Sequence, residues 1–339
     1  MQDVIVVGAG VAGLQCARRL RAAGADVLVV DRADKPGGRC ATRWTGGQPF
    51  DYGPQFLHGS DPAFLASVAS VPGEPLEGWP RRIEGSGTPC QPDSFAPHQR
   101  RLAFAEGLHS YPRTLADGVT VKLRTQIISL SVADGAVSVQ SAAGERFEAR
   151  DLVLALALEQ ALPFLRMLPP GSERDGALAL LEMFVSSPCL TVAAGYPGTA
   201  PAPSWDILYP EEEESILLVG HDSAKRPGAR SVVLVCQGSA RWSRMRLDGP
   251  KEDWTKELLG KLARLVGAWA DHPEWVHPHR WRFSRVDRAN ELAAPLELRV
   301  GSSRIGVAGD LFSPGGGIQA SWVSGDRLGD RLSGSSPTG

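Results

Sequence analysis

The sequence predicts an α/β protein of two domains, and three observations lead to that prediction. The chain has 339 residues, which is long enough for two separate cores. It begins with a short apolar run, a glycine-rich turn and a helical pattern, the order found in a βαβ unit. Its middle part contains several short strand-like runs, which predict a second domain around a mixed sheet.

The first element is a βαβ unit with a glycine-rich turn. Residues 3–7 form an apolar β-branched run typical of a buried strand, residues 14–22 form a helix, and residues 27–30 form a second strand. Gly8-Ala9-Gly10-Val11-Ala12-Gly13 joins the first strand to the helix, and Asp31 follows the second strand. A strand, a GxGxxG turn, a helix and a later acid together indicate a Rossmann-type dinucleotide site.

Each position of this motif has a physical role. Gly8 permits the tight turn, Gly10 lets the backbone approach a pyrophosphate, and Gly13 lets helix and strand pack closely. The helix N-terminus offers unpaired N–H groups and the positive end of its dipole to a diphosphate. The Asp31 carboxylate can accept hydrogen bonds from ribose hydroxyls, and its charge would repel a 2′-phosphate. We therefore expect an adenosine diphosphate moiety here.

Composition and charge exclude several classes of protein. The chain is 42% hydrophobic and 22% charged with a net charge of −2, which argues against a nucleic-acid binder or a membrane-surface protein. The apolar run at 152–158 is too short to span a bilayer, and no basic leader precedes the first strand. Five scattered cysteines without a CxxC pair favour reduced thiols over disulfides or a zinc site. We expect a cytoplasmic protein without metal, and the sequence leaves its oligomeric state open.

Local patterns predict the remaining elements in order. We expect a turn over 34–39, a loop over 50–61, helices over 62–70, 107–115, 252–270 and 316–332, and strands over 119–123, 127–132, 136–139, 151–156, 190–194, 215–219, 232–236 and 305–308. Asp134-Gly135 predicts a hairpin turn, and the acidic run at 211–214 predicts a solvated turn. Residues 72–97 are rich in Pro and Gly, so we expect them to cross between the domains. The apolar face of the helix expected over 252–270 consists of Trp254, Leu258, Leu262, Leu265 and Trp269.

A second group of glycines near the C-terminus specifies the cofactor. Gly309-Asp310 follows a predicted strand, and Gly315-Gly316-Gly317 opens the last helix. The carboxylate can bind ribityl or ribose hydroxyls, and the glycines let the backbone approach a flat ring. A helix N-terminus there would stabilise negative charge on a reduced flavin. A nicotinamide dehydrogenase needs no such second clamp, so together with Asp31 and Gly37-Gly38-Arg39 the prediction is non-covalently bound FAD.

With these motifs the chain resembles the flavoproteins that have the para-hydroxybenzoate-hydroxylase-like fold, including the flavin amine oxidases. Within that group it resembles the renalase family over most of its length, in the middle more by pattern than by identity. The segments that match are 152–156 with Leu162, Leu181-Glu182, Ser186-Ser187, Pro203-Ser204-Trp205, Tyr209, 221–226, 279–283 and Gly317-Ile318.

The resemblance implies an FAD-dependent oxidase of the 2- and 6-dihydro isomers of NAD(P). The flavin takes a hydride at N5 and dioxygen reoxidises it, giving NAD(P)+ and hydrogen peroxide. Motif and resemblance together imply FAD contacts at Gly8, Gly10, Ala12, Gly13, Asp31, Arg32, Gly38, Arg39, Gln55, Phe56, Ile127 (through its backbone), Gly309, Asp310, Gly317 and Ile318. The implied substrate cavity is lined by Leu57, His58, Gly59, Ser60, Asp61, Ala96, Pro97, His98, Ser186, Tyr209 and His279.

The implied domains are built from separate parts of the chain. The FAD-binding domain comprises residues 1–70, 100–162 and 285–332, the mixed α+β substrate domain comprises 71–99 and 163–284, and residues 333–339 form a flexible tail. Hydride transfer from a dihydropyridine removes no proton from the donor carbon, so the protein's task is positioning and we expect no general base. His58, His98 and His279 are candidates for hydrogen bonds to the carboxamide or ribose, or are structural.

An amine oxidase is the main alternative. Enzymes of that kind that resemble this fold usually place an aromatic pair at the flavin and a lysine bridged by water to N5. Tyr196, Trp205, Tyr209 and Trp281 could supply such aromatics or could belong to the core. Lys225 lies in a polar Asp-Ser-Ala-Lys-Arg-Pro turn, a poor place for a buried lysine, which weakens this alternative.

Two further classes remain for comparison. Aromatic hydroxylases carry a mid-chain Asp-Gly motif, and here Asp134-Gly135 and Asp248-Gly249 both lie in predicted turns. The chain has no second GxGxxG, so any pyridine nucleotide must enter the substrate cavity itself. A structural or sensing flavoprotein is the non-enzymatic class. The sequence leaves open the choice between 2- and 6-dihydro isomers and between NAD and NADP forms.

Overall fold

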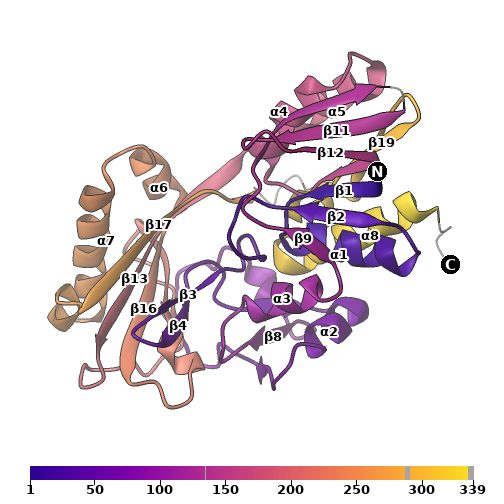
Figure 1. Ribbon diagram of the computed structural model, residues 1–339. Coiled ribbons are helices and arrows are strands. Elements are labelled where there is room, and N and C mark those ends of the chain that lie inside the picture. The colour runs from indigo at the N-terminus through magenta and orange to yellow at the C-terminus, as the bar shows by residue number, and fades with distance from the viewer. Residues whose placement is uncertain (134, 287–290, 335–339) are drawn as a thin grey trace. The chain divides into compact units, whose positions relative to one another are not determined.

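The chain folds around two large sheets, each in its own unit (Figure 1). This computed structural model describes residues 1–133, 135–286 and 291–334. Unit 1 consists of Met1–Gly38, Tyr111–Ser186 and Arg285–Gly339, and unit 2 of Arg39–Ser110 and Ser187–Ser284. The predicted α/β class with a Rossmann-type sheet and a second sheet-rich part is confirmed.

The boundaries between the two units differ from the expected domain boundaries. Residues 39–70 and 100–110 lie in unit 2 and residues 163–186 in unit 1. Residues 72–97 lie wholly within unit 2, so the prediction that they cross between domains is wrong. Local patterns show where an element begins and ends but not which sheet it joins, because pairing partners are distant in the sequence.

Unit 1 contains a mainly parallel sheet. Its order is β10-β11-β12-β1-β2-β9, with β19 also pairing with β12 and β18 pairing with β19. The strands are β1 (Gln2–Val7), β2 (Val27–Val30), β9 (Thr120–Lys122), β10 (Ile127–Ala133), β11 (Ala136–Ser141), β12 (Arg146–Leu154), β18 (Leu296–Val300) and β19 (Ser303–Val307). β9, β2, β1, β12 and β19 run parallel, which is the arrangement that a βαβ unit requires.

The helices of unit 1 are α1 (Val11–Ala22), α3 (Ser110–Ala116, starting one residue before the boundary), α4 (Leu158–Met167), α5 (Ser172–Leu181) and α8 (Gly317–Ser333), with the 3-10 turn η5 (Asp310–Phe312). α1 and α8 lie side by side (Figure 1). A Cβ at Gly325 would collide with the Ala12 carbonyl, and one at Gly329 with the Arg19 side chain. Two glycines one turn apart therefore let α8 pack directly on the backbone of α1.

Unit 2 contains a six-stranded mixed sheet of order β17-β13-β16-β15-β14-β7. Its strands are β7 (Ile83–Glu84), β13 (Ser186–Pro197), β14 (Ile207–Leu208), β15 (Ile216–His221), β16 (Ser231–Gly238) and β17 (Trp275–Val286). Two smaller sheets accompany it, the hairpin β3 (Thr42–Thr45) with β4 (Gln48–Asp51), and β5 (Leu57–Gly59) with β8 (Arg100–Ala103) and β6 (Leu76–Glu77). The helical segments are α2 (Pro62–Ala69), α6 (Ala240–Arg246), α7 (Lys251–Val266), η1 (Pro92–Phe95), η2 (Asp222–Lys225) and η3 (Ala268–Asp271).

α7 packs against the large sheet of unit 2 through the predicted apolar face. Trp254, Leu258 and Leu262 are buried there in one core with Tyr196 and Trp205. The Tyr196 hydroxyl donates to the Ala270 carbonyl (2.9 Å), so this tyrosine is part of the core. The helix ends at Val266 rather than at the predicted residue 270, because Gly267 takes φ 114° and turns the chain.

Several predicted elements are confirmed, and others were missed. The strands at the N-terminus, helix α2, strands β10, β11, β13, β15 and β16, and helix α8 lie where the patterns place them. The loop expected over 50–61 contains the end of β4 and all of β5, because β5 pairs with β8, about forty residues away. Asp134 of the predicted hairpin turn and residues 335–339 of the predicted tail lie outside the described residues.

All five cysteines are free thiols. Within residues 1–133, 135–286 and 291–334, no helix has both the length and the apolar character needed to cross a bilayer.

Candidate functional site

The glycine turn of unit 1 divides into packed and open positions. Gly8 takes φ 114°, and a Cβ there would collide with the Ala155 carbonyl oxygen. A Cβ at Gly13 would collide with the Gly8 carbonyl. At Gly10, in contrast, no atom lies within 4 Å of the place of a Cβ. Gly8 and Gly13 thus serve turn and packing, and the backbone at Gly10 faces open space in which a ligand can approach.

The N-terminus of α1 is available to an anion. Gly10 is its N-cap, and among the described residues no side chain caps it. The first helical hydrogen bond runs from the Leu14 N–H to the Gly10 carbonyl (2.9 Å), so the preceding N–H groups have no partner within the helix. A diphosphate fits this position, because N–H groups and the helix dipole both favour negative charge.

Asp31 ties the glycine turn to the end of β2. One carboxylate oxygen accepts the Ala9 N–H (2.6 Å) and the other accepts the Ala33 N–H (2.8 Å). Each oxygen keeps a second lone pair, so the carboxylate can still accept from ribose hydroxyls. The Thr125 N–H donates to the Asp31 carbonyl (2.8 Å), which brings the segment leading to Ile127 beside the same turn.

The second glycine pair packs on the first turn. The Gly37 N–H donates to the Ala9 carbonyl (2.8 Å). A Cβ at Gly38 would lie 3.5 Å from the Cα of Gly10. The structure therefore brings the predicted residues from Gly8 to Gly13, Asp31 and Gly38 together in unit 1. Arg32, next to Asp31, is exposed.

The second group of glycines, at Gly309 and at Gly315–Gly317, also belongs to unit 1. The Ser324 hydroxyl accepts from the Gly309 N–H (3.0 Å) and donates to the Gly309 carbonyl (2.8 Å), which fixes the end of β19 against α8. Gly315, Gly316 and Gly317 all take positive φ, between 58° and 91°, a backbone that only glycine adopts freely. Asp310 begins η5, and α8 begins at Gly317 without a side-chain cap among the described residues. FAD fits this pair of uncapped helix ends with their glycine turns.

Arg39, Gln55 and Phe56 lie in unit 2, and the side chain of Gln55 is occupied there. Its amide nitrogen donates to the carbonyls of Asp51 (2.8 Å) and Gly53 (3.2 Å). Its Oε1 is buried against Gly220 and has no hydrogen-bond donor among the described residues. The amide nitrogen of Gln55 is therefore occupied within unit 2, and Oε1 is the side-chain atom without a partner among the described residues. Arg39 donates to the Ser284 carbonyl (3.0 Å).

Lys225 is fully buried, so the prediction that its turn is a poor place for a buried lysine is wrong. Its Nζ bonds to the carboxylates of Asp51 (2.8 Å) and Asp222 (2.7 Å) and to the Gln55 carbonyl (3.0 Å). An ammonium group has three N–H donors, so all three are used inside unit 2. This polar turn can be buried because two cations and two carboxylates neutralise one another. One of these carboxylates, that of Asp51, is 174 residues away from Lys225 in the sequence.

Arg226 completes this buried charge cluster. Its guanidinium bonds to Asp51 (2.9 Å) and Asp222 (3.1 Å). Burial alone would raise the pKa of Asp51, but the charges of Lys225 and Arg226 outweigh it and hold that pKa well below its usual value. Asp51 therefore stays ionised throughout the neutral range.

Several predicted substrate residues have structural roles. Leu57 is fully buried in β5. Asp61 caps α2 by accepting the Phe64 N–H (2.8 Å). Ser60 accepts from the Gln99 amide (3.2 Å), and both ring nitrogens of His58 face glutamine side chains. The interpretation of Leu57 and Asp61 as cavity-lining side chains is therefore not supported by their packing.

An aromatic cluster surrounds Tyr209. The Phe95 ring lies 6.2 Å from Tyr209 edge-on and 5.9 Å from Phe56, and Phe56 lies 6.2 Å from Trp79. Burial raises the pKa of Tyr209 well above its usual value, so its hydroxyl stays protonated. Ala96, Pro97 and His98 directly follow Phe95, so the structure brings the residues around 95–98 together with Tyr209.

His279 lies in a different cluster. Its ring is 4.2 Å from Trp281 and 4.8 Å from Tyr52, and burial lowers its pKa to about 4. Three strands lie between β17 and β14 in the sheet, and Tyr209 directly follows β14. Among the described residues, the ring contacts of His279 are thus with other residues than those of Tyr209. Sequence reasoning missed His277, which stacks with His279 and whose signal is the period of two along β17.

Ser186 is the first residue of β13 and lies at the boundary between the units. It belongs to unit 1, where its N–H (2.6 Å) and hydroxyl (2.9 Å) both donate to Glu159.

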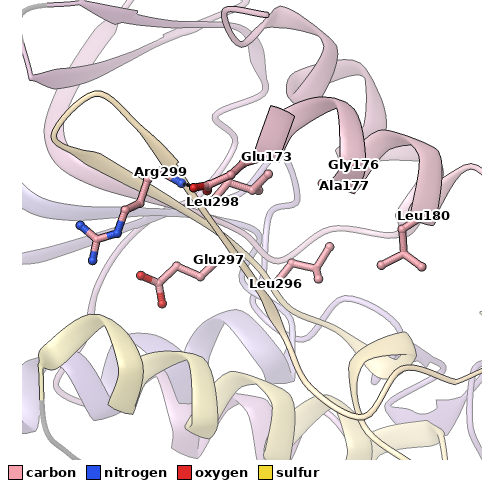
Figure 2. A pocket seen from close by; sticks show the side chains of 8 residues that line it. All are labelled: Glu173, Gly176, Ala177, Leu180, Leu296, Glu297, Leu298 and Arg299. Carbon is pink, nitrogen blue, oxygen red and sulfur yellow. Dashed lines mark hydrogen bonds between the residues drawn. The ribbon is translucent and has the colours of Figure 1, made fainter. Parts of the chain in front are cut away.

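Unit 1 also contains an open cleft of about 470 Å³ between α5 and β18. Figure 2 shows Glu173 of α5 turned to the backbone of Arg299, whose N–H it accepts (2.6 Å). Leu180 and Leu296 give the cleft an apolar part. None of its lining residues is a predicted cofactor or substrate residue.

Comparison with known families gives two matches. Residues 6–69 match the NAD(P)-binding Rossmann-like domain, and residues 93–332 match the flavin containing amine oxidoreductase family. Among curated proteins, the chain is 38% identical over 92 residues to the putrescine oxidase of Kocuria rosea (27% of this chain, 19% of that protein). It is 52% identical over 57 residues to the neurosporene-forming phytoene desaturase of Rhodobacter capsulatus (17% of this chain, 11% of that protein). These stretches span less than a fifth of either relative.

Among the solved structures that resemble the whole chain are two amine oxidases. Putrescine oxidase bound to putrescine has a TM-score of 0.71 at 15% identity, covering 98% of both chains. Cyclohexylamine oxidase from Brevibacterium oxydans has a TM-score of 0.74 at 15% identity, covering 98% of this chain and 99% of that one. At such identity the likeness concerns the fold.

Proposed function

The chain belongs to the flavin containing amine oxidoreductase family, and from that premise we propose that it is an FAD-dependent oxidase of 2- and 6-dihydro isomers of NAD(P). Bound FAD supplies a hydride acceptor that dioxygen regenerates, so that the substrate leaves as NAD(P)+ and dioxygen as hydrogen peroxide. The family match supports the flavin chemistry. The resemblance to renalases in residues 203–205, Tyr209, 221–226 and 279–283 supports the substrate class.

We assign cofactor binding chiefly to unit 1. Gly10 and the α1 N-terminus would hold the diphosphate, and Asp31 a ribose. The turn at Gly315–317 would lie against the ring system, with Asp310 at the ribityl chain. The full set assigned is Gly8, Gly10, Ala12, Gly13, Asp31, Arg32, Gly38, Ile127, Gly309, Asp310, Gly317 and Ile318 of unit 1. For Arg39, Gln55 and Phe56, which lie in unit 2, the FAD contact stays a prediction from the sequence.

The observation that supports the substrate assignment most is that all three N–H donors of Lys225 are used within unit 2. Amine oxidases that resemble this fold usually present a lysine to a water at the flavin. The chain has six lysines, and Lys225 is the one that is buried among the described residues. Its three N–H donors bind Asp51, Asp222 and the Gln55 carbonyl, so none remains for such a water. A dihydropyridine gives up a hydride without prior removal of a proton, so it needs no such lysine.

The residues of this chain position the substrate ring. Phe56, Phe95 and Tyr209 form an aromatic wall that suits a flat dihydronicotinamide. The Tyr209 hydroxyl stays protonated and can donate to a carboxamide oxygen. We propose that this wall, with Ala96, Pro97 and His98, recognises the substrate, and that water is excluded by the apolar rings.

Oxygen uptake with different donors tests this proposal. The purified holoenzyme is supplied with 6-dihydro-NAD, 2-dihydro-NAD, ordinary 4-dihydro-NADH, putrescine and cyclohexylamine in turn. We expect uptake with the first two, at one hydrogen peroxide per dioxygen consumed, and a rate at least about tenfold lower with the others. The Tyr209→Phe variant should raise KM and keep most of kcat, because it removes one hydrogen bond and leaves the ring.

Oxidation of an amine is the second candidate, and the family description favours it. Uptake with an amine alone would support this candidate and overturn the dihydronicotinamide assignment.

A further inference from the structure

His58 holds both ends of one loop in unit 2. Its Nε2 lies 2.9 Å from Oε1 of Gln91, and its Nδ1 lies 3.3 Å from Oε1 of Gln99. Gln91 and Gln99 directly flank the segment 92–98, which contains η1 and Phe95. A single imidazole in β5 is thus bonded to the residue before the loop and to the residue after it.

The hydrogen bonds of this clamp use the whole imidazole. A neutral histidine has one donor and one acceptor nitrogen. The Gln99 amide nitrogen donates to the Ser60 hydroxyl (3.2 Å), which turns the Gln99 oxygen toward His58. Nδ1–H then donates to Gln99, and Nε2 accepts from Gln91 with the amide of that glutamine turned, since its O and N positions are interchangeable. Neither ring nitrogen is left for a substrate.

The loop between the two glutamines is braced internally. The Gln91 carbonyl accepts the Ser94 N–H (3.0 Å) and hydroxyl (2.6 Å), and the Ala96 carbonyl accepts the Gln99 N–H (2.9 Å). These hydrogen bonds tie the residues of the loop to one another. Besides its chain ends, its attachments to the rest of unit 2 include the His58 clamp and the packing of Phe95 against Phe56 and Tyr209.

We propose that His58 is a positioning residue that holds the segment 91–99 closed, so that Phe95 stays seated against Phe56 and Tyr209. The wall of the substrate site is then formed before substrate binds. His58 itself makes no substrate contact. The proposal rests on the proposed function only for the identity of the substrate.

Two substitutions separate the hydrogen bonds of His58 from its shape. His58→Phe keeps a ring beside Phe56 and removes both bonds, whereas His58→Gln removes the ring and keeps one donor and one acceptor. His272→Ala, an exposed histidine elsewhere in unit 2, is the control. Gln91→Ala and its double variant with His58→Phe show whether the two residues act as a unit.

Hydrogen–deuterium exchange of the substrate-free holoenzyme is the first measurement. We expect peptides covering 91–99 to exchange about tenfold faster in His58→Phe and at the wild-type rate in His58→Gln and His272→Ala. Gln91→Ala should give most of the same increase, and the double variant no more. Unchanged exchange in His58→Phe, with the protein folded and yellow, would overturn the clamp.

Kinetics give the second measurement. With the loop loosened, His58→Phe should raise KM for the dihydro-NAD isomer about five- to tenfold with kcat within about twofold, because part of the binding energy now closes the loop. A fall in kcat at unchanged KM would instead mean direct action on substrate and would contradict the proposal. The exchange measurement needs no substrate. A wild-type enzyme that no dihydro-NAD isomer reduces would therefore overturn the proposed function and leave the clamp to be judged by exchange alone.

Discussion

The side chains of Asp51, Asp222, Lys225 and Arg226 form a closed electrostatic cluster inside unit 2. Such a cluster adds little net stability when complete, but removing one partner leaves an uncompensated buried charge. It fixes the backbone of Asp51 and Gln55, between which the aromatic Tyr52 and the tight turn at Gly53 are held. The cluster explains why Lys225 can be buried in this fold while its ammonium group has no free N–H donor for a reaction.

Replacing Lys225 tests how much stability is lost when one partner of the buried cluster is removed. Lys225→Met keeps the length of the side chain and removes its charge, which leaves Asp51 and Asp222 with Arg226 alone. We expect the free energy of unfolding to fall by about 3–5 kcal/mol. Lys261→Met, which breaks the more exposed pair with Glu213, should cost at most about 1 kcal/mol. Urea denaturation measures both, and equal losses would contradict the account of the cluster.

We propose that Asp31 is the residue on which retention of FAD depends most. Asp31→Ala removes the acceptors of the Ala9 and Ala33 N–H groups as well as those offered to ribose. We expect the dissociation constant of FAD, titrated into the apoprotein, to rise at least about tenfold, which corresponds to about 1.4 kcal/mol. The dissociation constant of Asp31→Asn, which keeps one acceptor oxygen, should lie between those of the wild type and of Asp31→Ala. An unchanged dissociation constant in Asp31→Ala would remove this residue from the cofactor site.

His277 and His279 make the stability of unit 2 depend on pH. Burial lowers the pKa of each to about 4, assisted by the charge of Arg43 nearby, whereas an unfolded histidine titrates near 6.5. Between about pH 6.5 and pH 4 the unfolded chain therefore binds more protons than the folded one, so the free energy of unfolding falls as the pH is lowered through this window. We expect a loss on the order of 1–2 kcal/mol per histidine, because solvent screens these half-buried rings.

Urea unfolding between pH 4 and pH 7.5 checks the histidine effect. The double variant His277→Gln, His279→Gln should show a flatter dependence than the wild type over this range. Parallel curves for the two proteins would show that the histidines titrate normally.

At the scale of elements, the packing of α8 on α1 joins the two ends of the chain. Gly325 lies against the Ala12 carbonyl, within the first turn of α1. The Gln15 amide donates to Asp326 (2.8 Å), and Arg19 pairs with Asp330. The N-terminal and C-terminal halves of the predicted cofactor site are therefore held by one helix pair.

A side chain at Gly325 should disturb both stability and cofactor binding. Gly325→Ala forces α8 away from α1, and we expect a cost of about 1–3 kcal/mol in the free energy of unfolding, with a lower ratio of flavin to protein after gel filtration. Gly176→Ala in α5, where a Cβ meets nothing within 4 Å, is the matched control. It should be neutral or stabilise by up to about 1 kcal/mol. Full flavin content in Gly325→Ala would show that the helix contact does not govern the site.

How much the sequence could predict depends on whether an element is defined locally. β1, α1 and β2 were predicted because a GxGxxG turn and its flanking periods lie within one short stretch. The β3–β4 hairpin was missed because its strands are short and mostly polar, although they pair locally. β17 was missed because its alternation consists of aromatic and histidine side chains rather than aliphatic ones, and its partner β13 lies far along the chain. The burial of Lys225 was missed for the same reason, since Asp51 supplies its counter-charge from 174 residues away.

At the scale of the whole molecule, the chain passes between the units at residues 38–39, 110–111, 186–187 and 284–285. Each unit is assembled from separate segments, so neither can be cut out as one continuous piece. Unit 1 accounts for most of the proposed cofactor contacts, and unit 2 for the aromatic wall and the charge cluster. The family match extends over residues 93–332 and so includes parts of both units.

We propose that the flavin of this protein accepts a hydride from off-pathway dihydro-NAD(P) isomers and not from amines. Anaerobic stopped-flow measurement of flavin absorbance tests this substrate preference, because it isolates the reductive step from reoxidation. We expect rapid bleaching by 6- or 2-dihydro-NAD(P), with little change on mixing with ordinary 4-dihydro-NADH or with a monoamine. Rapid bleaching by a monoamine, with none by the dihydro isomers, would contradict it.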